Sequence, residues 1–408
     1  MKIRFSVDSV LFSFTVNQRR LGTAQTSFYC GYGEREYLDS VIIQKTHNLS
    51  CHNLDETKKI FNGIYENEKF IDDILQELNM LQNVISSSLT VSFMRKNRRY
   101  IVSNDVLKHD ISTATLNLNI VLVFSQKPVR CNREECIEFN NIKNIIVALH
   151  KMIMEICSSY REAPKLAFVE KNSIGSFENI IIPPGRGGII IHETVGHMLE
   201  ADNFFEENNP LYPLMGKKIS PIPIEIIDDS SPILTGDLAD DRSKKIKTIL
   251  VHEGSISSVL SDQLCADKYK INNTGNARAD QYLHLPIPRM CRTYLKGNLQ
   301  SHGNLLKEIR QGVLINEILG GCCDISTGSF SFNVSHAYLV KDGEKIAQIR
   351  PFTLIANTLS FLQNITHVGN DLDFYSSMCN KKGQMLRVVY GTPTTIVNTK
   401  KLEVAYGV

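Results

Sequence analysis

The sequence predicts an α+β protein with N-terminal helices packed on an antiparallel sheet and a C-terminal, mostly-β, barrel-like part that carries one short helix at His192. Long amphipathic helical patterns occur only in the first part, where they are interleaved with alternating strands. Farther along, short strands separated by turn residues dominate. A chain of 408 residues is long enough for two or three domains, and we expect two, over residues 1–175 and 176–408.

The N-terminal part opens with apolar residues that alternate from Ile3 to Val16, as in a β-strand. Apolar residues at helical spacings then predict one or two helices over residues 54–88. A second amphipathic pattern predicts a helix over residues 134–160. The remaining predicted elements of this part are a hairpin over residues 88–105 with its basic turn at Lys96–Arg99, and a strand over residues 113–125.

The C-terminal part begins with the stretch ENIIIPPGRGGIIIHETVGHMLEAD, residues 178–202, which predicts a strand, a turn, a second strand and the start of a helix. The turn PPGRGG lacks the Gly-Lys-Ser/Thr ending of a phosphate-binding loop, so we interpret it as structural. Further on, HEGS and KDGE predict tight hairpin turns, because glycine adopts a positive φ at little cost.

Composition excludes several classes of protein. Lys and Arg total 45 against 43 Asp and Glu, and a net charge of +2 gives no basis for a nucleic-acid-binding surface. No apolar run is long enough to span a bilayer. Ten cysteines without a tight framework, in a sequence that shows no export signal, favour free thiols in the cytoplasm over disulfides.

The segment HETVGH raises the question of a metal site. His192 and His197 are five residues apart, whereas the zinc-peptidase pattern H-E-x-x-H places its histidines four apart. An α-helix turns by about 100° per residue, so a spacing of five separates the two side chains by about 140°. A π-bulge, or an irregular helix start near Gly196, would absorb the extra residue and bring both imidazoles to one ion.

The chemistry of hydrolysis is present in the same segment. Glu193 directly follows the first histidine, where a carboxylate can act as general base for a metal-activated water. The local sequence leaves the third ligand open: Glu200 and Asp202 are near, and His252, His284, His302 or any cysteine are distant alternatives. A motif that fixes only three residues also occurs by chance. In that case His192 is a buried residue that caps or satisfies a turn in the core, and Glu193 is a solvated carboxylate at a helix start.

Further motifs resemble the TldD/PmbA peptidase family. HETVGHMLEAD is similar to that family's H-E-[AG]-x-G-H-x-L-E-[GA]-D signature, and NTGNARADQYLHLPIPRM to its T-G-N-x-R-x-x-x-Y-x-x-x-P-x-P-R-M block. MCNKKGQ resembles its C-G-K-x-G-Q block. The resemblance runs from about residue 178 to 405. Thr194, Asn380, Cys291 and Arg292 depart from the usual residues.

The resemblance implies a metal site and a reaction. It assigns His192, His197 and Cys379 as ligands of one Zn²⁺ and Glu193 as the catalytic base. It also implies hydrolysis of short or unfolded peptides, for maturation or degradation, in an enclosed cleft between two related subunits that form a homodimer or a heterodimer.

Other assignments stay open. Tyr282, His284 and Arg289 are candidates for substrate binding or for a second oxyanion donor; the alternative is a structural turn in which Arg289 pairs with a carboxylate. Two other functions also remain: a non-catalytic binding subunit of the TldE/PmbA type, and a metal-dependent hydrolase of a non-peptide amide. The natural substrate and the cleavage site are not set by the sequence.

Overall fold

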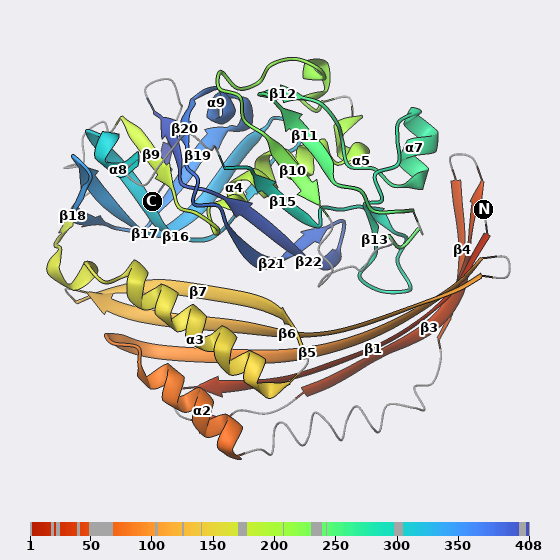
Figure 1. Cartoon of the computed structure of the whole chain (residues 1–408), viewed down its shortest axis with the longest axis horizontal. Helices are drawn as coiled ribbons and strands as arrows, with labels where there is room; N and C mark the ends of the chain where they lie inside the picture. The colour runs from red at the N-terminus through yellow and green to blue at the C-terminus, as the bar shows by residue number, and fades with distance from the viewer. Residues whose placement is uncertain are drawn as a thin grey trace.

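The computed structural model describes residues 2–17, 20–21, 25–38, 41–48, 68–102, 105–124, 126–139, 141–169, 178–206, 208–229, 239–241, 243–297, 305–399 and 405–407. Its N-terminal part is a long, curved antiparallel sheet, and the C-terminal part lies above this sheet (Figure 1). In spatial order the sheet consists of β4 (Val41–Asn48), β3 (Gln25–Leu38), β1 (Lys2–Asn17), β5 (Val84–Val102), β6 (Asp105–Phe124) and β7 (Lys127–Glu138), with β2 (Arg20–Leu21) paired to β1.

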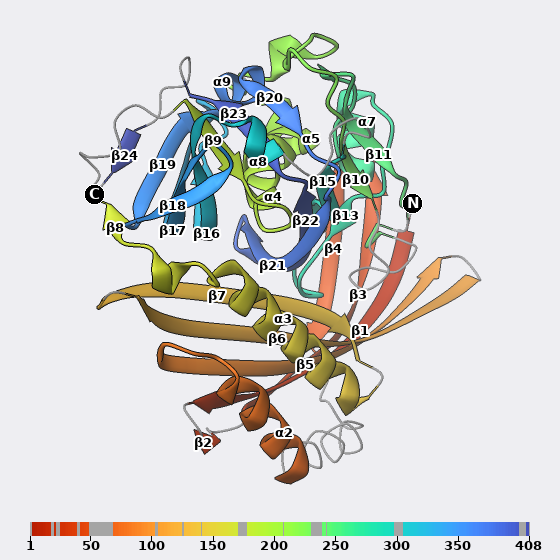
Figure 2. The ribbon, with the colours of Figure 1, turned by 60° about the vertical axis from the view of Figure 1, so that its left-hand side comes forward.

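Two helices, α2 (Glu68–Asn79) and α3 (Ile142–Ser159), cover one face of this sheet (Figure 2). Their apolar residues join those of β5 and β6 in one buried cluster, as the predicted helical periodicities require. The helix α3 begins after Asn141, whose side chain accepts a hydrogen bond from the backbone N–H of Asn144 at 3.2 Å. The prediction of helices packed on an antiparallel sheet is therefore confirmed.

Three predicted boundaries in this part are wrong. The helix predicted over residues 54–88 ends at Asn79, and β5 begins at Val84; residues 51–67 lie outside the described ranges. The predicted basic turn at Lys96–Arg99 is a continuous strand, because β5 stays paired with β6 as far as the pair Val102 and Asp105. The helix predicted from residue 134 begins only at Ile142, because residues 134–138 complete β7.

The C-terminal part contains two larger sheets and a small one. The first has the order β20 (Ile365–Val368), β23 (Thr395–Asn398), β9 (Asn179–Ile182), β16 (Gln311–Cys323), β17 (Ser329–Lys341), β18 (Glu344–Ile349) and β8 (Phe168–Val169), with β19 (Phe352–Asn357) paired to β17 and β24 (Ala405–Gly407). The second has the order β12 (Ser255–Ile256), β11 (Thr248–His252), β10 (Ile226–Asp229), β15 (Arg292–Leu295), β22 (Gln384–Thr392) and β21 (Asp373–Lys381), and β13 (Ala277–Arg278) pairs with β14 (Ile287–Pro288).

Short helices connect these strands. They are η1 (Ala163–Lys165), α4 (Gly188–Ile191), η3 (His192–Gly196), η4 (His197–Leu199), α5 (Ala201–Phe204), η5 (Tyr212–Leu214), α7 (Gln263–Tyr269), α8 (Leu305–Glu308) and α9 (Thr358–Gln363). Both predicted glycine turns are present, with positive φ at Gly254 and Gly343. Within the described ranges, no helix is both long and apolar enough to cross a membrane.

Two C-terminal predictions are wrong. Among the described strands both larger sheets are open, so the part is mostly β but not a barrel. The helical segment from Gly188 to Leu199 contacts both sheets: α4 contacts β15 and β22 of one sheet, and η3 contacts β15 of that sheet and β16 of the other. The segment therefore lies between the two sheets. The strand predicted after the PPGRGG turn is the helix α4.

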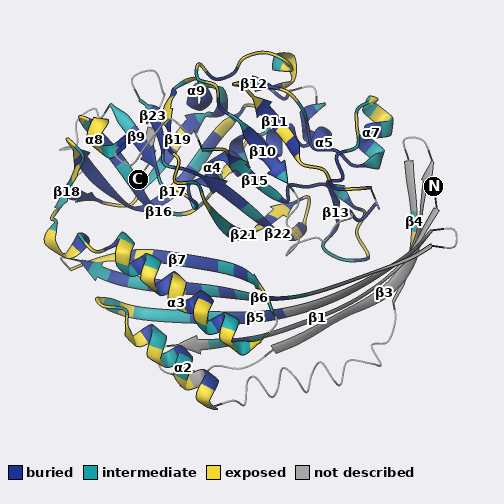
Figure 3. Ribbon diagram, in the orientation of Figure 1, coloured by how far each residue is buried: buried dark blue, intermediate teal, exposed yellow. Residues whose placement is uncertain are grey.

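Buried residues form separate clusters in the two parts (Figure 3). Among the described residues, the buried members of the N-terminal cluster lie within residues 14–163 apart from Tyr338, and those of the largest cluster lie within residues 180–397; Leu314 packs against the first cluster and Val169 against the second. On this basis we retain a domain boundary near residue 175 as a proposal.

Buried charges join the N-terminal sheet to the C-terminal part. Glu317 on β16 and Arg133 on β7 have completely buried side chains, with Nη1 of Arg133 2.6 Å from the Glu317 carboxylate. Arg186, in the turn before α4, contacts the same carboxylate at 2.7 Å. Burial acts to raise the pKa of Glu317, but the two guanidinium groups outweigh it and the pKa falls below its usual value. The turn that leads into the HETVGH segment is thus fixed against the N-terminal sheet.

Candidate metal centre

The HETVGH segment is helical throughout but is not an α-helix. The α-helix α4 passes into a π-helical turn over residues 192–196, followed by the 3₁₀ turn η4. The backbone N–H of His197 donates to the carbonyl of His192, five residues back, as a π-turn requires. The two imidazole rings lie edge to face with centroids 4.9 Å apart. The predicted bulge is confirmed, and it places both histidines on one side of the segment.

Close packing fixes the position of this turn. Gly196 lies directly against the buried side chain of Met290, and a Cβ atom at this position would overlap its sulfur. Val195 is fully buried, so the turn is enclosed on its inner side. A glycine immediately before the second histidine therefore allows the close approach that a larger residue would prevent.

Cys379 on β21 completes a group of three possible metal ligands. The donor atoms of His192, His197 and Cys379 all lie within 4.8 Å of one another, and all three residues are buried. Nε2 of His197 is 3.2 Å from the Cys379 sulfur, across a separation of 182 residues in sequence. Ligands about 2.0–2.3 Å from a tetrahedral zinc ion are this close to one another.

Two observations show that these residues fit a zinc ion. Both ring nitrogens of His192 are buried and make no hydrogen bond in the described part of the chain, although buried polar atoms are normally paired. Burial alone raises the pKa of the Cys379 thiol, but His192 and His197 outweigh it and lower the pKa to about 4. Thiolate and imidazole are the donors that catalytic zinc sites use, with one coordination position left for water or substrate.

Glu193 projects from the π-turn and is partly exposed, unlike the histidines on either side of it in the motif. Burial raises the pKa of its carboxyl group, and His192 and His197 oppose that rise. A carboxyl group with a raised pKa exchanges protons more readily near neutral pH than an ordinary glutamate does.

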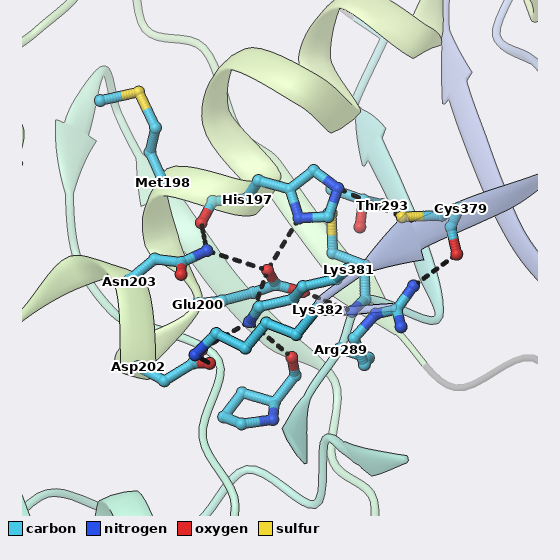
Figure 4. A network of polar contacts seen from close by, with 12 residues as sticks. His197, Met198, Glu200, Asp202, Asn203, Arg289, Thr293, Cys379, Lys381 and Lys382 are labelled. Carbon is cyan, nitrogen blue, oxygen red and sulfur yellow. Dashed lines mark hydrogen bonds and ion pairs between the residues drawn. The ribbon is translucent and has the colours of Figure 1, made fainter. Parts of the chain in front are cut away.

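His197 belongs to a wider polar network (Figure 4). Its Nδ1 lies 2.8 Å from the carboxylate of Glu200, on the opposite side of the ring from Cys379. Lys381, two residues after Cys379, contacts Glu200 at 3.0 Å. Glu200 is one of the local candidates for the third ligand. In the structure its carboxylate instead contacts Nδ1 of His197, on the side of the ring away from Cys379.

The three candidate substrate residues occupy different environments. Tyr282 is buried, and the ring of His284 is half exposed with its Nδ1 2.6 Å from Asp280. Arg289 is completely buried, and its guanidinium donates to the backbone carbonyls of Cys379 at 2.8 Å and Gln384 at 3.0 Å. This placement favours Arg289 as a support for the Cys379 hairpin, with carbonyl groups rather than a carboxylate as hydrogen-bond acceptors.

A second group of possible ligands, Glu225, His252 and Glu253, lies at the surface. His252 and Glu253 are exposed, and Lys296 already contacts Glu225 at 2.6 Å. This second group is less buried than the first and contains no cysteine sulfur. His252 is therefore a weaker candidate than Cys379, His284 belongs to neither group, and His302 lies outside the described residues.

Sequence comparisons match this part of the chain. A sequence model described as the PmbA/TldA metallopeptidase C-terminal domain matches residues 175–405. A protein named metalloprotease TldD homolog from Buchnera aphidicola subsp. Schizaphis graminum is 33% identical over 253 residues, 60% of this chain and 52% of that protein. One named zinc metalloprotease TldD homolog, from Saccharolobus solfataricus, is 29% identical over 231 residues, 55% of this chain and 51% of that protein. The chain thus spans about half the length of these curated relatives.

Solved structures resemble the whole fold at low identity. A protein titled a putative modulator of a DNA gyrase from Thermotoga maritima has a TM-score of 0.74 and 13% identity, and the match covers 100% of this chain and 96% of that one. TldE from Thermococcus kodakarensis has a TM-score of 0.68 and 14% identity over 97% of this chain and 96% of its own. At such identities the likeness concerns the fold alone.

Proposed function

Because the chain belongs to the PmbA/TldA metallopeptidase family, we propose that it is a zinc-dependent peptidase that hydrolyses short or unfolded peptides. The observation that carries the proposal is the π-turn, which brings His192 and His197 to Cys379 and leaves Glu193 accessible beside them. The name of the Saccharolobus relative supports zinc as the metal.

In the proposed mechanism His192, His197 and Cys379 hold the metal ion, which when bound supplies Lewis-acid activation of a water molecule and of the scissile carbonyl. Glu193 accepts a proton from the attacking water at a carboxylate oxygen. It then donates that proton to the nitrogen of the leaving amine. Its raised pKa suits both steps, because the same group must act first as base and then as acid.

A strand edge near Glu193 supports a peptide as the substrate. In the described part of the chain β16 pairs with β17 along its length but with β9 only over residues 312–314. The rest of that edge leads to Cys323, where burial raises the pKa of the thiol to about 11 and the nearby Glu193 carboxylate adds to the rise. An extended peptide that pairs with such an edge is held by its backbone, which tolerates many sequences.

We further propose a cytoplasmic enzyme that works with a related subunit, as a homodimer or as a heterodimer with a TldE-like chain. Cysteines in several places of the described chain, among them Cys131, Cys265 and Cys379, are free thiols, which supports a reducing compartment. The likeness to TldE supports a partner of the same fold.

A purely non-catalytic subunit is disfavoured, because all three candidate ligands and Glu193 are present. A peptide matured or degraded by this pair is the proposed substrate; a non-peptide amide remains the rival.

The test combines metal content with cleavage of a peptide library, on the protein with any partner that co-purifies from its native host. We expect about one zinc per chain in the wild type. Glu193→Gln should keep the zinc and lose about 10²–10⁴-fold in rate, the usual contribution of a general base. The matched control Glu253→Gln changes an exposed carboxylate outside the proposed site. A wild-type protein without zinc, or an undiminished rate in Glu193→Gln, would overturn the proposal.

A further inference from the structure

Glu200 is completely buried immediately behind a candidate metal ligand. Its Oε2 lies 2.8 Å from Nδ1 of His197, while Nε2 of the same ring lies 3.2 Å from the Cys379 sulfur. The ring therefore stands between the carboxylate and the proposed metal position (Figure 4). A carboxylate in this place is able to fix both the rotation of the ring and the nitrogen that carries hydrogen.

Among the described residues, the other partners of the Glu200 carboxylate are all hydrogen-bond donors. They are the ammonium of Lys381 at 3.0 Å, the backbone N–H of Met290 at 3.3 Å and the side-chain amide of Asn203 at 3.4 Å. An ammonium group and a backbone N–H have no lone pair to offer. Glu200 is thus an acceptor toward each of these described neighbours, and Nδ1 of His197 must donate to it.

This hydrogen bond determines the state of the ring in the metal-loaded protein. With hydrogen on Nδ1, the lone pair of a neutral imidazole is on Nε2, which points toward Cys379. We propose that Glu200, held in place by Lys381, is a positioning residue that presents Nε2 of His197 to the metal. The inference rests on the proposed function, since it assigns a role within the same site.

Lys381 links the two segments that supply ligands. It follows Cys379 by two residues on β21, and its side chain is only 7% exposed. Its ammonium also contacts Asp202 at 2.5 Å and the carbonyl of Pro288 at 3.0 Å. One cation therefore joins the Cys379 strand to the segment that follows His197, so the third ligand and the support for the second are held together.

Lys382 offers a matched control. It carries the same charge at the next position and also contacts Asp202, at 2.8 Å, but its side chain is 53% exposed. If charge near the site were sufficient, the two lysines would be equivalent. If contact with Glu200 is what matters, only Lys381 should affect the metal.

The experiment measures zinc affinity by competition with a chromogenic chelator in the wild type and in Glu200→Gln, Lys381→Met and Lys382→Met. We expect Glu200→Gln to weaken zinc binding about 10–100-fold, the usual effect of removing such a support. Lys381→Met should weaken it in the same direction, and Lys382→Met should leave it unchanged. Thermal unfolding of the metal-free proteins checks that each variant is folded.

Nitrogen NMR of the His197 ring in the zinc-loaded wild type needs no substitution, so it decides the matter even if Glu200→Gln does not fold. We expect hydrogen on Nδ1 and metal on Nε2. The reverse arrangement, unchanged affinity in folded Glu200→Gln, or an equal loss in both lysine variants would overturn the role of Glu200 alone. A wild type that binds no zinc would instead overturn the proposed function, and this role with it.

Discussion

His336 provides a quantitative test of how the two parts of the chain are joined. It lies on β17 and is completely buried. The centroid of its ring is 5.0 Å from that of Tyr160 and 4.7 Å from that of Tyr338. Its Nε2 is 2.9 Å from Oε1 of Gln348, whose amide group already donates to the carbonyls of Ala163 and Leu166. Nε2 must therefore carry hydrogen, and Nδ1 is buried with no hydrogen-bond partner in the described structure.

Protonation of Nδ1 would place a charge in this interior. Burial lowers the pKa of His336 from 6.5 to about 4, against smaller opposing effects of Gln348 and Glu317, while Lys345 also lowers it. Because the folded-state pKa is depressed, the stabilisation is complete above pH 6.5 and is lost as the pH falls toward 4. The difference, 6.5 − 4 = 2.5, corresponds to about 3 kcal/mol at ~1.36 kcal/mol per pKa unit.

The assay is equilibrium unfolding in urea at a series of pH values, for the wild type and for His336→Asn. Asparagine does not titrate in this range and can still donate to Gln348, so the variant removes the pH-dependent contribution while it loses some packing. We expect the free energy of unfolding of the wild type to fall by about 3 kcal/mol more than that of the variant between pH 6.5 and 4. Parallel curves for the two proteins would refute the reasoning.

Three further predictions concern packing, buried charge and a helix cap. Gly196→Ala should destabilise the fold by about 1–3 kcal/mol and weaken zinc binding, because the new methyl group overlaps Met290; adding Met290→Ala should restore binding, and failure of that rescue would contradict the packing argument. Glu317→Gln should cost about 3–5 kcal/mol in urea unfolding, because Arg133 would remain buried without its carboxylate; a cost below 1 kcal/mol would contradict this. Asn141→Ala should cost about 1 kcal/mol by the same assay, through loss of the N-cap of α3, whereas the exposed Asn119→Ala should cost less.

The candidate site shows where reasoning from local sequence succeeds. The five-residue spacing and Gly196 predicted an irregular helical turn, and the π-turn follows from them. Cys379 could be reached only through the resemblance to a family, because it lies on a hairpin 182 residues beyond His197. Lys381 stands at the lysine of the C-G-K-x-G-Q block, but its local sequence assigns it no role: a lysine in a polar, charged stretch is ordinarily solvated, and only the fold brings it to Glu200.

The errors in the fold have physical causes too. Gly188–Ile191 resembles a strand because a short apolar run buried on several sides has no amphipathic pattern to mark it as helix. Residues 134–138 join a strand to the following helix with little to mark the change before Asn141. The short helix at His192 was predicted, but the strand patterns do not indicate that it lies between two open sheets rather than beside a closed barrel.

The most direct test of the proposed metal centre is X-ray absorption at the zinc edge on the purified, zinc-loaded protein. We expect one sulfur ligand at about 2.3 Å and two imidazole nitrogens at about 2.0–2.1 Å, with a light atom in the remaining position. Cys379→Ala should remove the sulfur contribution and keep the fold. A first shell without sulfur in the wild type, or a sulfur signal that survives in Cys379→Ala, would contradict the account.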